Sequence, residues 1–165
     1  MHGSSLNFGN LRPAVVALGA NLGDRAGTLS AALAELEARG NVVLARSSFY
    51  ETKPVGYLNQ PDFLNATALV GVRATFSPED FLAELLDIEK KFGRERPFPN
   101  APRTLDLDLI FFENEMRDTA FLTLPHPRWR EREFVTIPLR EMFSALGERV
   151  PACFRFLNEK TPPLF

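Results

Sequence analysis

The chain has 165 residues, a net charge of −2 and a single cysteine, Cys153. This length favours one domain that buries its own core, and one cysteine cannot form an internal disulfide, which favours a reducing compartment. The nearly balanced charge gives no reason to expect nucleic acid or an anionic membrane as a partner, and no apolar run has the length of a membrane span. We therefore expect a cytoplasmic protein, taken as a monomer, with neither nucleic acid nor a membrane as a partner.

The first part of the chain predicts a lead, a strand and a helix. Residues 1–12 have little apolar pattern and are expected to be a flexible lead, which leaves residues 13–165 as the domain. Residues 14–18 are all apolar, which predicts a central strand covered on both faces, and residues 19–24 follow as a turn. Apolar residues at helical spacing, closed by Gly40, predict a helix over residues 25–39.

Residues 42–52 are strand-like, and residues 53–62 follow as a loop with two prolines and no apolar period. A loop of this length, with little packing of its own, is a common place for function. The next strand is expected over residues 63–72, with Phe63 and Asn65 on one face. A ring and an amide two residues apart suit a flat heterocycle, although a core phenylalanine and a turn-capping asparagine give the same pattern.

The run Ser77-Pro78-Glu79-Asp80 predicts a helix start, because it combines a capping residue, a proline at the first position and acids in the first turn. We expect this helix to end at Gly93. Residues 94–103 then form a second long loop, which contains Arg94, Arg96 and Arg103.

Residues 104–112 alternate leucines with acids, which predicts a strand with one core face and one polar face. The core face is expected to hold Leu105, Leu107, Leu109 and Phe111, and the other face Thr104, Asp106, Asp108, Ile110 and Phe112. The Cα atoms of Asp106 and Asp108 would lie roughly 7 Å apart, close enough for their carboxylates to repel unless a cation lies between them. Oxygen ligands without cysteine or histidine suit Mg²⁺; a solvated acidic face is the alternative.

The remaining chain gives weaker signals. Residues 121–124 predict a short strand that Pro125-His126-Pro127 ends, and His126 in this turn suits either a phosphate contact or a structural role. A helix is expected over residues 135–143, with Pro138 leaving its start open. The rest of the tail is expected to be irregular.

The elements up to residue 112 follow the order strand, helix, strand, strand, helix, strand. This is the βαββαβ order of a ferredoxin-like α+β sandwich, here with a C-terminal extension. The two helices would cover one face of the sheet. The other face could then carry Asn65, Asp106 and Asp108 in one cleft.

Three motifs occur together in this order: Asp62-Phe63-Leu64-Asn65-Ala66, Pro102-Arg103-Thr104-Leu105-Asp106-Leu107-Asp108 and Leu124-Pro125-His126-Pro127-Arg128. Over residues 15–143 the chain closely resembles the 6-hydroxymethyl-7,8-dihydropterin pyrophosphokinase family of folate biosynthesis. The resemblance implies one pyrophosphokinase domain that transfers pyrophosphate from ATP to the pterin hydroxymethyl group, giving AMP and the pterin diphosphate. Asn100 stands where many members have tryptophan, and Phe63 where tyrosine is frequent.

The resemblance also implies roles for individual residues. It implies catalytic roles for Arg94, Arg103, Asp106 and Asp108, and two Mg²⁺ ions held by Asp106 and Asp108. Pterin contacts are implied for Thr52, Val55, Phe63, Asn65 and Phe134. ATP contacts are implied for Glu89, Arg94, Arg96, Arg103, His126 and Arg132.

General chemistry agrees with this expectation. Pyrophosphoryl transfer depends on positioning and on positive charge rather than on a protein nucleophile, and the sequence lacks the Gly-x-x-x-x-Gly-Lys-Ser/Thr pattern of P-loop kinases. A sensor of nucleotide or metal would use the same aspartates and Arg103 but would not consume ATP. RNA binding would need paired aromatic residues on central strands and a basic surface, and neither is evident.

Overall fold

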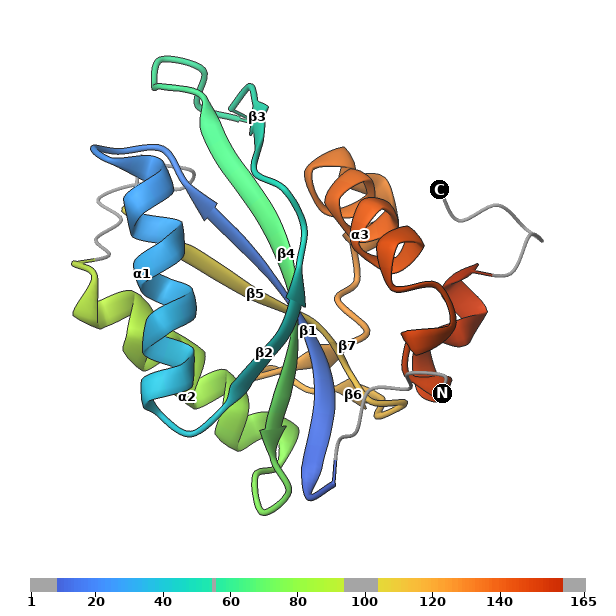
Figure 1. The fold of residues 1–165 in the computed structure, drawn as a ribbon. Helices are drawn as coiled ribbons and strands as arrows, with labels where there is room; N and C mark the ends of the chain where they lie inside the picture. The colour runs from blue at the N-terminus through green and yellow to red at the C-terminus, as the bar shows by residue number, and fades with distance from the viewer. Residues whose placement is uncertain (1–8, 55, 94–103, 159–165) are drawn as a thin grey trace.

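The computed structural model describes residues 9–54, 56–93 and 104–158. Its elements in chain order are β1 (Leu11–Ala20), α1 (Arg25–Ala38), β2 (Val42–Arg46), β3 (Tyr50–Thr52), β4 (Phe63–Arg73), α2 (Pro78–Lys91), β5 (Asp106–Phe112), β6 (Arg117–Asp118), β7 (Thr123–Leu124), η1 (Trp129–Glu131), α3 (Glu133–Leu146), η2 (Gly147–Arg149) and η3 (Ala152–Asn158). Helices and an antiparallel sheet occur together, which confirms the α+β class (Figure 1).

The main sheet has the strand order β2-β4-β1-β5, with β3 also paired to β4, and every pairing is antiparallel. β1 is central and is buried from residue 13 to residue 20, so the prediction of a strand covered on both faces is confirmed. The strand includes Leu11 and Arg12, which belonged to the expected lead, and Arg12 pairs with Glu113 and Glu115 at 2.8 Å. Residues 1–8 of that lead lie outside the described residues.

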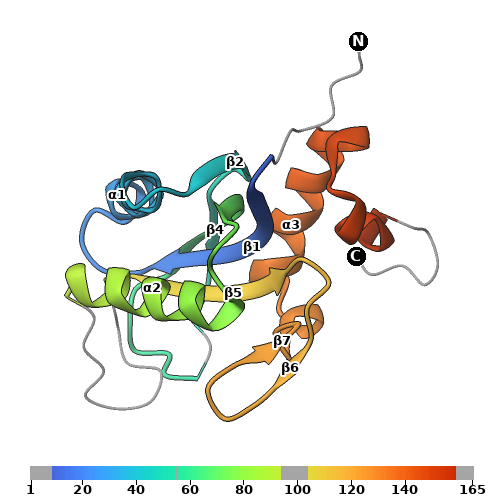
Figure 2. The ribbon, with the colours of Figure 1, turned by 90° about the horizontal axis from the view of Figure 1, so that it is seen from below.

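α1 and α2 lie together on one side of the sheet (Figure 2). Their buried residues, among them Leu36 and Leu85, meet alternate residues of β1 and β4 in the larger core. The predicted ends are confirmed. Ser77 accepts a hydrogen bond from the Asp80 backbone N–H, and the Asp80 side chain accepts one from the Ser77 N–H, both at 3.0 Å; Gly40 follows α1 with a φ of 98° that favours glycine.

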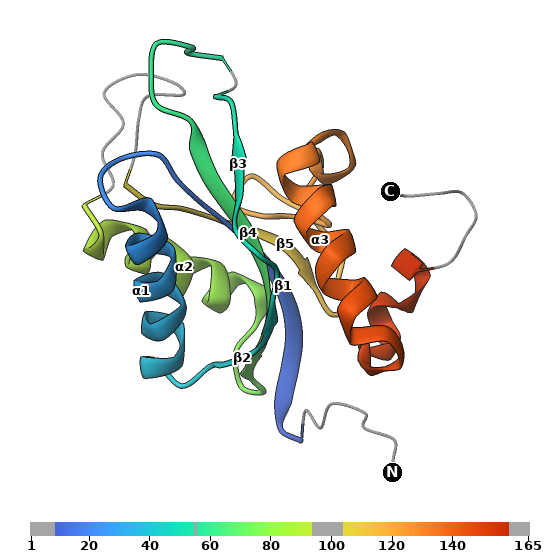
Figure 3. The ribbon, with the colours of Figure 1, turned by 45° about the horizontal axis from the view of Figure 1, so that its top comes forward.

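α3 lies on the opposite side of the sheet (Figure 3). Its residues Val135, Leu139 and Phe143 recur at helical spacing and pack against Val15 and Ile110 in a second core. α1 and α2 thus cover one face as expected, and the apolar stripe of α3 covers part of the opposite face as well. α3 also begins two residues before the expected start and carries Pro138 inside it.

The strand expected over residues 42–52 is two strands. Between them, the Ser47 hydroxyl replaces a backbone carbonyl as the acceptor for β4: it accepts a hydrogen bond from the Thr67 N–H at 3.0 Å. The Ser47 N–H still donates to the Thr67 carbonyl at 2.9 Å. The chain leaves the ladder there and returns at Tyr50. Glu141 on α3 then accepts hydrogen bonds from the Ser48 hydroxyl at 2.9 Å and the Tyr50 hydroxyl at 2.6 Å, which attaches this segment to α3.

A β-bulge changes the predicted faces of β5. Val16 pairs with Leu109 and Val15 with Phe111, so Ile110 is an extra residue. Beyond it the alternation is reversed: Phe111 packs in the second core and Phe112 in the first, opposite to the prediction. Leu105, Leu107 and Leu109 lie in the first core as predicted.

The C-terminal segment is more ordered than predicted. Of the strand expected over residues 121–124, only Thr123 and Leu124 form β7, which pairs with β6. The tail that was expected to be irregular contains η2 and η3, and Phe154 and Leu157 are buried in the second core. Within the described residues, the helices lack the combined length and hydropathy needed to cross a bilayer.

Cys153 is half-buried in η3, and burial, assisted by the charge of Glu113, raises the pKa of its thiol to about 11. We expect iodoacetamide to alkylate it about 100-fold more slowly in the folded protein than in urea, since a pKa about two units higher leaves about 100-fold less thiolate. Mass spectrometry of alkylation over time, with and without urea, measures the ratio. Equal rates in both states would contradict the buried thiol.

Candidate functional site

The sheet register places three predicted site residues on one face. Gly19 pairs with Asn65 on one side and with Asp106 on the other, and Ala17 pairs with Asp108. Paired residues of antiparallel strands point to the same face, and with strands roughly 4.8 Å apart the backbones of Asn65 and Asp106 lie roughly 10 Å from each other. Gly19 has no side chain, so the surface between Asn65 and Asp106 is open.

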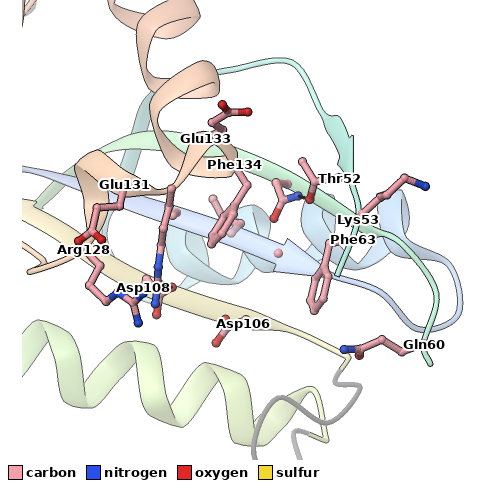
Figure 4. Close-up of a pocket in the computed structure, with 15 residues that line it drawn as sticks. Thr52, Lys53, Gln60, Phe63, Asp106, Asp108, Arg128, Glu131, Glu133 and Phe134 are labelled. Atoms are coloured by element: carbon pink, nitrogen blue, oxygen red, sulfur yellow. Dashed lines mark hydrogen bonds and ion pairs between the residues drawn. The ribbon is translucent and has the colours of Figure 1, made fainter. Parts of the chain in front are cut away.

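A cavity of about 570 Å³ covers this part of the sheet. Its lining includes Ala17, Gly19, Phe63, Asn65 and Phe134, together with Asp106 and Asp108. Phe63 on β4 and Phe134 at the start of α3 both project into the cavity, and Asp106 lies on β5 below them (Figure 4). Two rings, one amide and two carboxylates therefore share one space.

Gly19 is a feature of this cavity that the sequence analysis assigned only to a turn. A Cβ atom at this position would lie 3.2 Å from Asn65 Oδ1 and 3.8 Å from the Phe63 ring. Gly19→Val would therefore fill the floor and displace the amide, and we expect it to lower the affinity of a flat heterocyclic ligand for this cavity about 10- to 100-fold. Isothermal titration of the parent and the variant with such a ligand tests this, and an unchanged affinity would contradict it.

Asn65 is held in place from the side of β3. Asn65 is 5% exposed, and its Nδ2 donates a hydrogen bond to the Thr52 hydroxyl at 2.5 Å. Oδ1 lies on the Gly19 side. The predicted site residues Thr52, Phe63 and Asn65 are thus brought together, whereas Val55 lies outside the described residues.

The loop before β4 has more contacts than its sequence indicates. The buried Asn21 donates to the Gln60 side chain at 2.7 Å, and Gln60 donates to the Tyr57 carbonyl at 2.6 Å. Arg25 donates to the Asp62 carbonyl at 3.0 Å. The expectation of a loop with little packing of its own is therefore wrong for residues 56–62, and these bonds place Gln60 in the wall of the cavity.

A second cavity, of about 330 Å³, lies beside the first. Its lining includes apolar Leu82, Leu86 and Phe121 and polar Glu89 and His126. Asp106 and Asp108 line both cavities. A molecule in the first cavity and a molecule in the second would consequently meet at the two carboxylates.

His126 also lines this second cavity, and a hydrogen bond holds its backbone against β5. Its N–H donates to the carbonyl of Ile110, the bulge residue of β5, at 2.9 Å. Burial, followed by the charge of Arg132, lowers the pKa of its ring despite the opposing effect of Asp106. Because Nδ1 accepts the Arg128 N–H at 3.2 Å, the proton of the neutral ring is on Nε2, which can donate to a ligand.

Of the four predicted arginines, Arg132 lies within the described residues. Arg132 lines the first cavity and does not join His126 in the second; its guanidinium lies 4.0 Å from the Asp108 carboxylate and 5.6 Å from the centre of the Phe134 ring. Arg94, Arg96 and Arg103 lie outside the described residues.

The donor set at the aspartates fits a hard cation. In the part of the chain that the structure describes, no group of three or more His, Cys, Asp or Glu side chains is arranged to hold a metal. Asp106 and Asp108 offer carboxylate oxygens from one face of β5. Mg²⁺ commonly uses one or two carboxylates together with substrate phosphates and water, so an incomplete protein shell is what this ion needs.

Comparison with known proteins identifies the family. A family model described as 7,8-dihydro-6-hydroxymethylpterin-pyrophosphokinase (HPPK) matches residues 15–144. The chain belongs to the HPPK family. The resemblance noted from the sequence motifs is therefore confirmed.

Three relatives of the chain are each named 2-amino-4-hydroxy-6-hydroxymethyldihydropteridine pyrophosphokinase. The protein of Synechocystis sp. is 44% identical over 130 residues, which are 78% of this chain and 65% of that protein. The Bacillus subtilis protein is 42% identical over 130 residues, 78% of this chain and 77% of its own length. The Haemophilus influenzae protein is 41% identical over 134 residues, which are 81% of this chain and 82% of that protein.

Several residues that line the two cavities were not individually assigned to a site from the sequence. The first cavity is also lined by Lys53, Gln60, Arg128, Glu131 and Glu133, and the second by Phe121 on the connection between β6 and β7. Their positions depend on how the loops fold back on the sheet. Lys53 and Gln60 had a signal, since both lie in a loop long enough to suggest function, and Arg128 had one as the last residue of the histidine motif.

Proposed function

We propose that this HPPK-family chain transfers pyrophosphate from ATP to the hydroxymethyl group of 6-hydroxymethyl-7,8-dihydropterin in folate biosynthesis. One observation carries the proposal: Asp106 and Asp108 line both of two adjacent cavities. A reaction that joins two small molecules needs two neighbouring sites with the charge-stabilising groups between them. The family match and the names of the relatives agree with it.

The first cavity is proposed to bind the pterin. Phe63 and Phe134 supply apolar surfaces for a flat ring. Asn65 offers an amide, and its bond to Thr52 fixes the orientation of that amide before any ligand arrives. The proposal also includes Val55 among the pterin contacts. The hydroxymethyl group would then point along the open floor at Gly19 towards Asp106.

The second cavity is proposed to bind ATP. Its apolar lining from α2 and Phe121 suits a base, and His126 offers an Nε2 donor for phosphate or ribose oxygen. Arg94, Arg96, Arg103 and Arg132 are proposed to hold the phosphates, because forked guanidinium groups match phosphate oxygens. Glu89 belongs to the proposed ATP site through its position in this lining.

Asp106 and Asp108 are proposed to hold two Mg²⁺ ions, and Arg94 and Arg103 to complete the catalytic set. When bound, magnesium offsets the negative charge that crowds the phosphate oxygens during transfer. The aspartates would position that charge between the two substrates. The hydroxyl oxygen bonds to the β-phosphorus and gives up its proton to water, while the bond between the β-phosphorus and the α–β bridging oxygen breaks and AMP leaves with that oxygen.

Three broader statements complete the proposal. The strand order β2-β4-β1-β5, with α1 and α2 on one face, supports a ferredoxin-like arrangement in which α3 and η3 form the C-terminal extension. One chain lines both cavities, so a monomer is sufficient and no nucleic acid or membrane is required. We place the reaction in the cytoplasm, where ATP is supplied.

The proposal is tested by the nucleotide that the reaction releases. With MgATP and the pterin alcohol, we expect one AMP for each pterin diphosphate, no ADP, and no turnover after chelation of Mg²⁺. Chromatography of nucleotides and pterins measures this. ADP with a pterin monophosphate would make the chain a different kinase, and binding of MgATP without turnover would favour the sensor.

A further inference from the structure

Glu89 has a contact that the proposed ATP role does not explain. This residue lies near the end of α2, is 3% exposed, and its carboxylate accepts a hydrogen bond from the Leu107 backbone N–H at 2.6 Å. Leu107 is the residue between Asp106 and Asp108. A buried carboxylate is costly to desolvate and is retained where it makes charge-assisted hydrogen bonds.

The contact lies on the outer edge of β5. This strand is last in the order β2-β4-β1-β5, so its edge away from β1 has no further strand of this sheet. Two groups bond to that edge instead: the Glu89 carboxylate at the Leu107 N–H and the His126 N–H at the Ile110 carbonyl. Together they fix the backbone on either side of Asp108.

The peptide unit involved is the one that joins Asp106 to Leu107. The Leu107 side chain is anchored in the first core at 3% exposure, and the Leu107 N–H is held by Glu89. A shift of the strand backbone at Leu107 would move the side chains of Asp106 and Asp108, which flank it on the other face of β5. A hydrogen bond to an ionised acceptor is about twice as strong as one between neutral groups.

We infer that Glu89 is a positioning residue, which holds the Leu107 peptide and thereby sets the directions of Asp106 and Asp108. This inference rests on the proposed function, which gives the two aspartates their role. Glu89 keeps its place in the lining of the proposed ATP cavity, but its negative charge makes a phosphate an unfavourable partner there. Partners that orient metal-binding residues typically change affinity or activity by about 10- to 100-fold when removed.

The test compares Glu89→Ala, Glu89→Gln and a matched control, Glu84→Ala. Glu84 lies on the same helix and accepts hydrogen bonds from Asn41 at 2.8 Å and Arg73 at 2.9 Å. Arg73 is the last residue of β4, whereas the cavity residue Phe63 is the first, so Glu84 acts at the other end of that strand. For each protein, steady-state kinetics gives kcat and KM, and amide NMR of the ligand-free protein gives the shift and deuterium exchange of Leu107.

We expect Glu89→Ala to lower kcat about 10- to 100-fold with KM for ATP changed less than about threefold. The Leu107 amide should move upfield and exchange faster, and the amides of Asp106 and Asp108 should shift. Glu89→Gln keeps an oxygen acceptor, so its kcat should stay within about threefold of the parent. Glu84→Ala should lower Tm without these effects.

Parental kcat in folded Glu89→Ala would overturn the inference, as would a large rise in KM for ATP in Glu89→Gln, which indicates a direct ligand. If Glu89→Ala does not fold, Glu89→Gln decides: loss of kcat with an unchanged Leu107 amide contradicts the positioning role. Failure of the proposed function is distinguishable, because the parent would then release no AMP while the Leu107 amide still reports whether Glu89 holds it.

Discussion

Asp106→Asn and Asp108→Asn are each expected to lower kcat by about 10³-fold or more and to leave the fold intact. Both carboxylates line the two cavities, and each substitution removes a negative charge that would hold a cation between the substrates. Metal-assisted stabilisation is worth several kcal/mol of the barrier, and about 1.4 kcal/mol corresponds to a tenfold change in rate. In the absence of ligand, neutralising one of two neighbouring acids relieves repulsion.

Steady-state rates and thermal melts of both variants measure this. The matched control is Asp87→Asn, which removes a carboxylate that is 65% exposed and pairs with Arg39 at 2.8 Å; it should retain parental kcat. We expect Tm of the site variants to change by less than about 3 °C. Near-normal rates, or unfolding of either variant, would show that these aspartates serve stability instead.

Asn65→Ala is expected to lower kcat/KM for the pterin about 10- to 100-fold, since losing hydrogen bonds in a buried polar site costs about 1–3 kcal/mol. The change removes the amide that faces the open floor at Gly19 and leaves the Thr52 hydroxyl without this donor. KM for ATP should change by less than about threefold, because Asn65 lines the first cavity and not the second.

Kinetics with each substrate varied in turn separate the two effects. Asn41→Ala is the matched control, since Asn41 is also a buried asparagine, 3% exposed, but bonds to Leu36 and Glu84 away from both cavities. It should lower Tm and keep the parental kcat/KM. A loss shared equally between ATP and pterin would mean that Asn65 shapes the whole sheet rather than one cavity.

The parts of the fold that follow from the sequence are those with local causes. The cap at Ser77, the glycine after α1 and the apolar run of β1 each act within a few residues, and each has the predicted result. The division of residues 42–52 depends instead on Ser47 bonding to Thr67, twenty residues away. A single sequence carries no signal for such a partner.

The same distinction explains the faces of β5. Alternation predicts which side Asp106 and Asp108 share, and this holds up to Leu109. The bulge at Ile110 arises where the backbone of His126 bonds to the strand edge, so the reversed positions of Phe111 and Phe112 depend on a turn that follows later in the chain. The packing of α3 on the second face is likewise a long-range event.

For the site, the order of the motifs was more informative than any residue alone. The acids, the Phe-x-Asn pair and the histidine turn each had a structural alternative, and only their occurrence together in this order pointed to the family. The open floor at Gly19 was not, because its importance comes from lying between Asn65 and Asp106 in the sheet. Nor could the sequence show that Arg132 lines the cavity of Phe134 while its charge also acts on His126.

The most direct test of the account is a crystal structure of the protein with Mg²⁺, the pterin alcohol and an ATP analogue whose α–β bridge cannot be cleaved. We predict the pterin between Phe63 and Phe134, the nucleotide beside His126, and metal density at Asp106 and Asp108, with the pterin hydroxyl facing the β-phosphorus. Both ligands in one cavity, or metal bound away from the two aspartates, would contradict the account.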